Sequence, residues 1–224
     1  MKHAIPAAFV AALTFFPTAA TAQTTPSGAQ PKGPSVNLWY IGATTGVAVV
    51  DHASAVAGGE VGFRVWKNLD LVGEITWMQD VVTRATLDKA NTIAQSIQAA
   101  QGQPATSDVE VPALYGGVGA RWVFEQVNRV KPYVITTFGG GHTERKPTFT
   151  LGGTDITNSL PTYGVTLGSD LIGKANDFTV SSGVGILMTF GSWYTDFGYR
   201  LTSIGTADQR TNVQRLLVGG GYRF

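Results

Sequence analysis

The sequence predicts an all-β fold, an eight-stranded antiparallel barrel with a short helical insertion in one long loop. Three observations predict it. Several segments alternate between apolar and polar residues with the period of two that a β-strand imposes. Glycine is abundant, at 28 of 224 residues, against a usual share of about 7%. Charged residues make up only 14% of the chain, well below the roughly 25% of soluble domains.

The first 22 residues have the layout of an export signal. Lys2 and His3 precede an apolar run that ends at Phe16, and the small residues Ala20-Thr21-Ala22 follow. This pattern predicts a secretory signal peptide cleaved before Gln23. The alternative, a retained anchor helix, needs about 20 apolar residues, which this run does not reach. Residues 23–35 contain three prolines and no periodic pattern, so we expect a disordered lead-in to a barrel domain at 36–224.

Composition excludes several other classes. The chain has no cysteine, which rules out disulfides and thiolate metal sites. Its formal net charge of +1 gives no basis for nucleic-acid binding. Histidines are few and scattered, so no metal site and no cofactor is predicted.

Strand candidates follow one another along the mature chain and are joined by polar turns. They lie at 36–50, 58–66, 69–77, 109–124, 132–141, 178–191, 193–201 and in the terminal segment that ends at Phe224. Residues 51–57 are expected to form a short loop, and residues 142–175, rich in Thr, Gly and Asn, a long irregular one. Eight strands in four hairpins result.

Residues 79–108 interrupt the strand pattern. Leu87, Ala90, Ala94 and Ile97 recur at steps of three and four, which is the period of a helix, and Gly102 and Pro104 end it. The sequence therefore predicts a helical insertion at 82–101. Two interpretations stay open: the helix packs over the barrel mouth, or it is an interfacial or partner-binding helix.

The residues on the polar face of the strands indicate whether the apolar face contacts lipid or a protein core. That face combines glycine and threonine with charges of both signs, which we expect to be paired inside the barrel: Glu60, Arg64, Glu74, Arg121, Asp196, Arg200 and Arg215. In a soluble, lipocalin-like barrel the outside is charged and the inside apolar. Small residues between paired charges fit a narrow interior instead, which turns the apolar face toward lipid. Aromatics near strand ends fit an interfacial girdle: Trp66, Trp77, Trp122, Phe124 and Trp193.

Several motifs resemble those of the small outer-membrane β-barrel proteins, the OmpA transmembrane-domain-like superfamily. They are Gly-Gly-Val-Gly-Ala-Arg-Trp at 116–122, Lys-Pro-Tyr-Val at 131–134, Phe-Gly-Tyr-Arg at 197–200 and the end of the chain. Gly219, Tyr222 and Phe224 match the spacing of the family's C-terminal assembly signal, although Leu217 stands where a polar residue is usual. The resemblance implies export to the outer membrane of a Gram-negative cell envelope. It also implies contact with outer-membrane lipids and lipopolysaccharide, and insertion by the barrel-assembly machinery.

The expected function is structural or a surface interaction through the loops at 79–108 and 142–175, with a partner that the sequence does not identify. One alternative is a narrow porin-like channel, although eight strands leave an interior that side chains can fill. The other is a lipid A-modifying hydrolase. His52-Ala53-Ser54 has an H-x-S spacing similar to that of such barrels, and His142 lies beside Thr143 and Glu144. Neither cluster completes a nucleophile, base and carboxylate set, so no catalytic residue is assigned.

Overall fold

The structure is a computed structural model that describes residues 38–205 and 210–224. The predicted signal peptide at 1–22 and lead-in at 23–35 lie outside these residues. Within the described parts, no helix has both the length and the apolar character needed to cross a bilayer.

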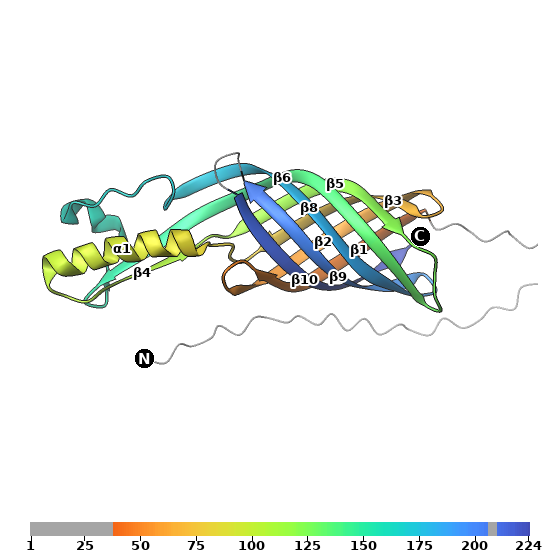
Figure 1. Cartoon of the computed structure of the whole chain (residues 1–224), viewed down its shortest axis with the longest axis horizontal. Coiled ribbons are helices and arrows are strands. Elements are labelled where there is room, and N and C mark those ends of the chain that lie inside the picture. Colours follow the sequence, from red (N-terminus) through yellow and green to blue (C-terminus); the bar gives the residue numbers. More distant parts are fainter. Residues whose placement is uncertain (1–37, 206–209) are drawn as a thin grey trace, which may run out of the picture. The chain divides into compact units, whose positions relative to one another are not determined.

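Eight antiparallel strands close into a barrel, as the sequence predicts (Figure 1). They are β1 Trp39–Val49, β2 Ala53–Trp66, β3 Leu69–Met78, β5 Ala113–Val123, β6 Val130–Leu151, β8 Gly173–Phe190, β9 Trp193–Gly205 and β10 Arg210–Arg223. Each pairs with the next in this series, and β10 returns to β1, where Tyr40 stands opposite Arg223 and Val49 opposite Gln214. Because β1 and β10 pair with each other, neither of these terminal strands has an unpaired edge.

Alternation along each strand separates two environments. In β10, Leu216 and Val218 are exposed on the outside of the barrel, whereas Arg215 is fully buried inside it. The same division holds around the ring, so the outer wall carries a belt of exposed Ile, Val, Leu and Phe side chains. Leu187 is an apolar exception on the inward face of β8, where its side chain is fully buried. The period of two thus separates an apolar outer surface from an interior that holds the charges, with a small apolar cluster of Val72, Val123, Ile135 and Leu187.

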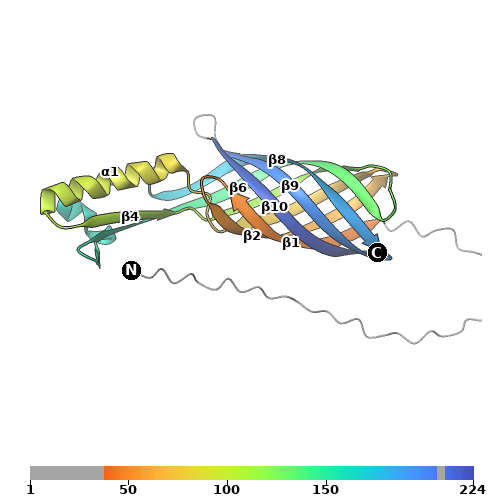
Figure 2. The ribbon, with the colours of Figure 1, turned by 60° about the horizontal axis from the view of Figure 1, so that its bottom comes forward.

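The two ends of the barrel differ. At one end the strands are joined by short turns at 67–68, 124–129 and 191–192, and Leu38 and Phe224 lie there too. The Phe224 N–H donates to the Trp39 carbonyl over 2.9 Å. At the other end, β3 connects to β5 and β6 connects to β8 through long segments (Figure 2). We call these the turn end and the loop end.

Helix α1, Arg84–Gln101, forms where the periodic pattern predicts it. The Thr83 side chain caps its first turn by accepting from the Thr86 N–H, and Gly102 ends it at φ 65° while donating to Gln98 O. This left-handed conformation suits glycine, which has no Cβ to clash. The helix packs on β4, Ala105–Glu110, and extends beyond the barrel strands rather than across the mouth (Figure 1).

A group of additional elements, which we call the head, stands at the loop end. It comprises residues 81–111 and 146–172: α1 and β4, the outer part of β6, β7 Thr154–Asp155, and the 3₁₀ helix η1 Thr157–Tyr163. β4 pairs with the outer part of β6, where Ala105 stands opposite Leu151 and Glu110 opposite Lys146. Apolar side chains from these elements are buried together, among them Val82, Ala94, Ile97, Val109, Phe149 and Leu160. The same cluster includes barrel residues such as Val56, Met78 and Val213, so the core of the head is continuous with the loop end of the barrel.

Three sequence predictions were wrong in detail. The segment 142–175 is not irregular throughout, because β6 runs for 22 residues and ends only at Leu151. Residues 53–57 belong to β2 rather than to a loop. Val109 lies in β4, outside the barrel, and the barrel strand begins at Ala113. The extra length of β6 depends on pairing with β4, a partner about 40 residues away that local periodicity does not reveal.

Candidate functional site

An ion-pair network occupies the middle of the barrel. Arg121 donates from Nη2 to Glu60 Oε1. Arg200 joins two strands, with Nη2 at 3.5 Å from Glu60 Oε2 and Nη1 at 3.4 Å from Glu74 Oε2. Arg121 and Arg200 are only 1% and 2% exposed. Four predicted interior charges, from β2, β3, β5 and β9, thus meet in one buried cluster.

The other predicted interior charges also have buried partners. Asp196 accepts a hydrogen bond of 2.8 Å from Tyr133 Oη. Arg215, fully buried, donates to Thr76 Oγ1 at 3.2 Å and to Ser181 Oγ at 2.9 Å. Arg64 differs from the rest, because it lies near the turn end, is partly exposed, and forms a bidentate pair with the buried Asp70. Hydroxyl groups, and not opposite charges, thus contact Asp196 and Arg215. Among the described residues, the buried Nε atoms of Arg121, Arg200 and Arg215 have no hydrogen-bond partner.

Four tyrosines complete the filling of the interior, although no local sequence pattern identifies them as a set. Each stands directly across the strand pairing from a glycine. The pairs are Tyr40 and Gly62, Tyr115 and Gly141, Tyr133 and Gly185, Tyr194 and Gly221. Three of these glycines leave the space that the paired ring occupies; a Cβ at Gly62, for example, would lie 1.9 Å from Tyr40 Cζ. For Tyr115 the space is left by Gly117, where a Cβ would lie 2.2 Å from Tyr115 Oη. The signal for this pattern is present in the sequence, but it appears only once the register is known.

These rings also contact the buried guanidinium groups. Arg121 lies 4.8 Å from the ring centre of Tyr133 and 5.2 Å from that of Tyr40. Cation–π contacts of this kind strengthen when they are desolvated. Tyrosine rings and paired charges therefore form one packed interior.

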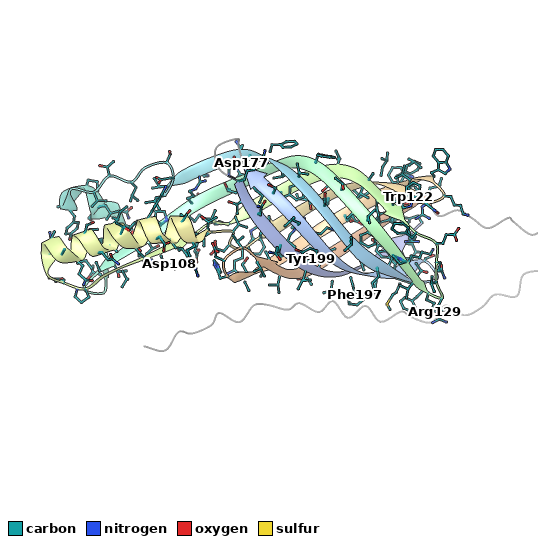
Figure 3. All side chains as sticks on the ribbon, in the orientation of Figure 1. Asp108, Trp122, Arg129, Asp177, Phe197 and Tyr199 are labelled. Carbon is teal, nitrogen blue, oxygen red and sulfur yellow. The ribbon has the colours of Figure 1, made fainter. Side chains whose placement is uncertain are left out.

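The aromatic residues assigned to a girdle are all exposed on the outer wall. Trp66, Trp122, Phe124 and Trp193 lie at the turn end, and Trp77 lies toward the loop end. Figure 3 shows Trp122 at the turn end, with Phe197 and Tyr199 on the outer wall. Such rings suit the boundary between lipid and water.

The residues of the terminal motif lie in and just beyond β10. Gly219 faces inward, where a Cβ would come within 2.6 Å of Ala43 O. Tyr222 packs edge-on against both Trp193 and Phe224, with ring centres 5.1 and 5.2 Å apart. An assembly role for Gly219, Tyr222 and Phe224 stays a prediction.

The H-x-S motif lies at the rim of the loop end, close to Asp80. His52 Nε2 is 2.9 Å from Asp80 Oδ2, so a histidine–carboxylate pair exists. However, Ser54 Oγ donates to the Asp80 backbone carbonyl over 2.6 Å and not to His52. His142 is on the outer wall, where it contacts Asn176 over 2.7 Å. Within the described residues, no group of three or more His, Cys, Asp or Glu is placed to hold a metal ion.

The closed antiparallel ring, apolar outside and charge-paired inside, defines the class of outer-membrane β-barrels. The chain belongs to the family described as the outer membrane protein β-barrel domain, whose model matches residues 8–224. This family implies a location in the outer membrane, as the sequence resemblance does.

Several solved structures are similar to this chain at low sequence identity. Neisserial surface protein A (NspA) is 14% identical, with a TM-score of 0.50 over 84% of this chain and 97% of that one. The N-terminal β-barrel domain of Pseudomonas aeruginosa OprF is 13% identical, with a TM-score of 0.48 over 83% and 97%. The outer membrane enzyme PagL is 11% identical, with a TM-score of 0.42 over 83% and 99%. At these identities the likeness concerns the fold alone. Among proteins with curated descriptions, none matches this sequence.

Proposed function

We propose that the protein is a non-conducting outer-membrane barrel that serves as a rigid base for a surface-interacting head. The observation that carries this proposal is the buried interior network of Glu60, Glu74, Arg121 and Arg200. Paired, desolvated charges packed with tyrosine rings fill this level of the barrel, so we expect water and ions not to pass through it. The barrel then acts as an anchor, and what it presents is the head.

The orientation of the barrel supports this role. Outer-membrane barrels have short periplasmic turns and longer extracellular loops. Applied to this chain, that rule turns the head outward, with Trp66, Trp122 and Trp193 at the periplasmic boundary. Outer-membrane lipids and lipopolysaccharide would then surround the apolar belt, and the barrel-assembly machinery would insert it. The head would meet partners at the cell surface.

Two alternatives are less well supported. A narrow channel requires the central charges to be hydrated, whereas their side chains are almost wholly buried. A lipid A hydrolase requires a nucleophile within hydrogen-bond reach of its base. The Ser54 hydroxyl instead donates to a backbone carbonyl, so His52 and Asp80 form a pair without a nucleophile. A non-enzymatic anchoring role fits these contacts better.

Single cysteines can test whether the interior is filled, because the chain has none of its own. Thr202→Cys places a thiol at a fully buried interior position, and Thr211→Cys places one at the loop-end mouth. In folded protein we expect a water-soluble thiol reagent to modify Thr202→Cys at least about a hundredfold more slowly, because the reagent reaches it only when the barrel opens.

The denatured variants serve as the control, since both should react at once. Equal rates for the two folded variants would show an open interior and overturn the proposed closed barrel.

A further inference from the structure

A cavity of about 790 Å³ lies where the head joins the barrel. Its wall is formed by the start of α1, by Thr143 and Arg145 of β6, by the first residues of β8 and by the adjoining ends of β9 and β10. Figure 3 shows Asp177, one of its lining residues, at the loop end of the barrel. A volume of this size is in the range of sites that bind small organic ligands.

Four basic side chains line this cavity against two acidic ones. The basic residues are Lys89, Arg145, Lys174 and Arg210, and the acidic ones are Asp170 and Asp177. They come from separate segments that the fold brings together, so the excess of positive charge belongs to the assembled site and not to a local run of the sequence. An anionic ligand would be favoured there.

The cations differ in how far they are already neutralised. Lys89 donates to Asp170 over 2.8 Å, and this hydrogen bond holds the pKa of Asp170 below its usual range. Lys174 lies 3.8 Å from Glu144. Within residues 38–205 and 210–224, the guanidinium groups of Arg145 and Arg210 form no ion pair. Arg145 also acts electrostatically on Asp170 and helps to hold its pKa down. The guanidinium groups of Arg145 and Arg210 are suited to phosphate, because guanidinium binds phosphate in a bidentate manner.

The other lining residues indicate a ligand larger than a simple ion. Hydroxyl groups of Thr86, Ser169 and Thr211 line the cavity together with the accessible apolar side chains of Ala85 and Ala175. Saccharides present hydroxyl edges and apolar C–H faces, which match a lining of this kind. A free phosphate ion would leave most of the volume unused.

We propose that this cavity binds a phosphorylated saccharide, with Arg145 and Arg210 contacting its phosphate. This proposal rests on the proposed surface role, because the cavity must face the outside of the cell. Two kinds of molecule could supply a phosphorylated sugar: the lipopolysaccharide that surrounds the barrel, and a soluble sugar phosphate.

Calorimetry on the purified protein in zwitterionic detergent tests the site, with trehalose 6-phosphate as the probe and trehalose as its uncharged match. We expect binding of the phosphorylated sugar only. Arg145→Gln and Arg210→Gln should each weaken it about tenfold, the usual loss for a charged hydrogen bond. Lys146→Gln removes a neighbouring charge outside the cavity and should change affinity by less than about twofold. Asp177→Asn should tighten binding, because it removes a negative charge from the wall.

Reconstitution with lipopolysaccharide distinguishes the sources. If membrane sugars occupy the site, phosphorylated lipopolysaccharide should abolish binding of the probe, and dephosphorylated lipopolysaccharide should not. If the ligand is soluble, neither should compete.

Equal affinity for trehalose, no effect of the two arginine variants, or tighter binding of a tetra-aspartate peptide would each overturn the proposal. These outcomes are separate from thiol reactivity at position 202, so failure of the cavity leaves the closed barrel standing, and the reverse also holds.

Discussion

Replacing Glu60 with Gln is expected to lower the free energy of unfolding by about 3–5 kcal/mol. Glu60 is 7% exposed and contacts both Arg121 and Arg200. Glutamine has nearly the same shape, so the substitution mainly removes the negative charge and leaves Arg121 buried without its carboxylate. The loss can be measured by urea unfolding in lipid vesicles, followed by tryptophan fluorescence and by the heat-modifiable gel mobility typical of folded barrels.

The matched control is Glu144→Gln. Glu144 also contacts two cations, Lys146 at 3.3 Å and Lys174 at 3.8 Å, but its side chain is 35% exposed. Solvent screens such pairs, so we expect a loss below about 1 kcal/mol. The double variant Glu60→Gln, Arg121→Gln should recover part of the stability lost in Glu60→Gln, because the uncompensated charge is gone. A Glu60→Gln protein as stable as the control would contradict the buried network.

Gly62→Ala should be a damaging substitution in the barrel wall, although an alanine adds only one carbon atom. The added Cβ would lie 1.9 Å from Tyr40 Cζ, so the ring must move, and Tyr40 is 5% exposed with little free space around it. Overpacking of this kind costs about 1–3 kcal/mol or more. The same unfolding assay measures it, together with the yield of folded protein.

Gly59→Ala is the control from the same strand. Gly59 faces outward, and the nearest atom to an added Cβ is Gly42 O at 3.6 Å, so we expect little change. Shortening the ring in Tyr40→Leu, Gly62→Ala should restore part of the loss. If Gly59→Ala and Gly62→Ala were equally stable, the pairing of interior tyrosines with glycines would not explain the glycine content.

The sequence predicts the barrel well because lipid outside and charge inside impose a strict period of two. β10 illustrates this, since Leu216 and Arg215 identify their faces without any knowledge of their neighbours. The helix was predictable for a similar reason, because α1 buries Ala90, Ala94 and Ile97 on one face and carries a local stop signal at Gly102.

What the sequence could not predict depends on register and on distant partners. β4 is a short and largely polar strand, and it is stabilised by β6, whose outer part follows it by about 40 residues. The interior tyrosines become meaningful only once Tyr40 is known to face Gly62 and Tyr133 to face Gly185. The cavity at the loop end likewise brings together Lys89 and Arg210, which are far apart in the chain. No local pattern contains that information.

Planar-bilayer recording of the folded protein tests the closed barrel most directly. Protein shown to be folded by its heat-modifiable mobility should insert without producing discrete current steps, because the network around Glu60 and Arg121 and the tyrosine rings fill the interior. Stable unitary steps from the same preparation, abolished by heat denaturation before insertion, would contradict the account.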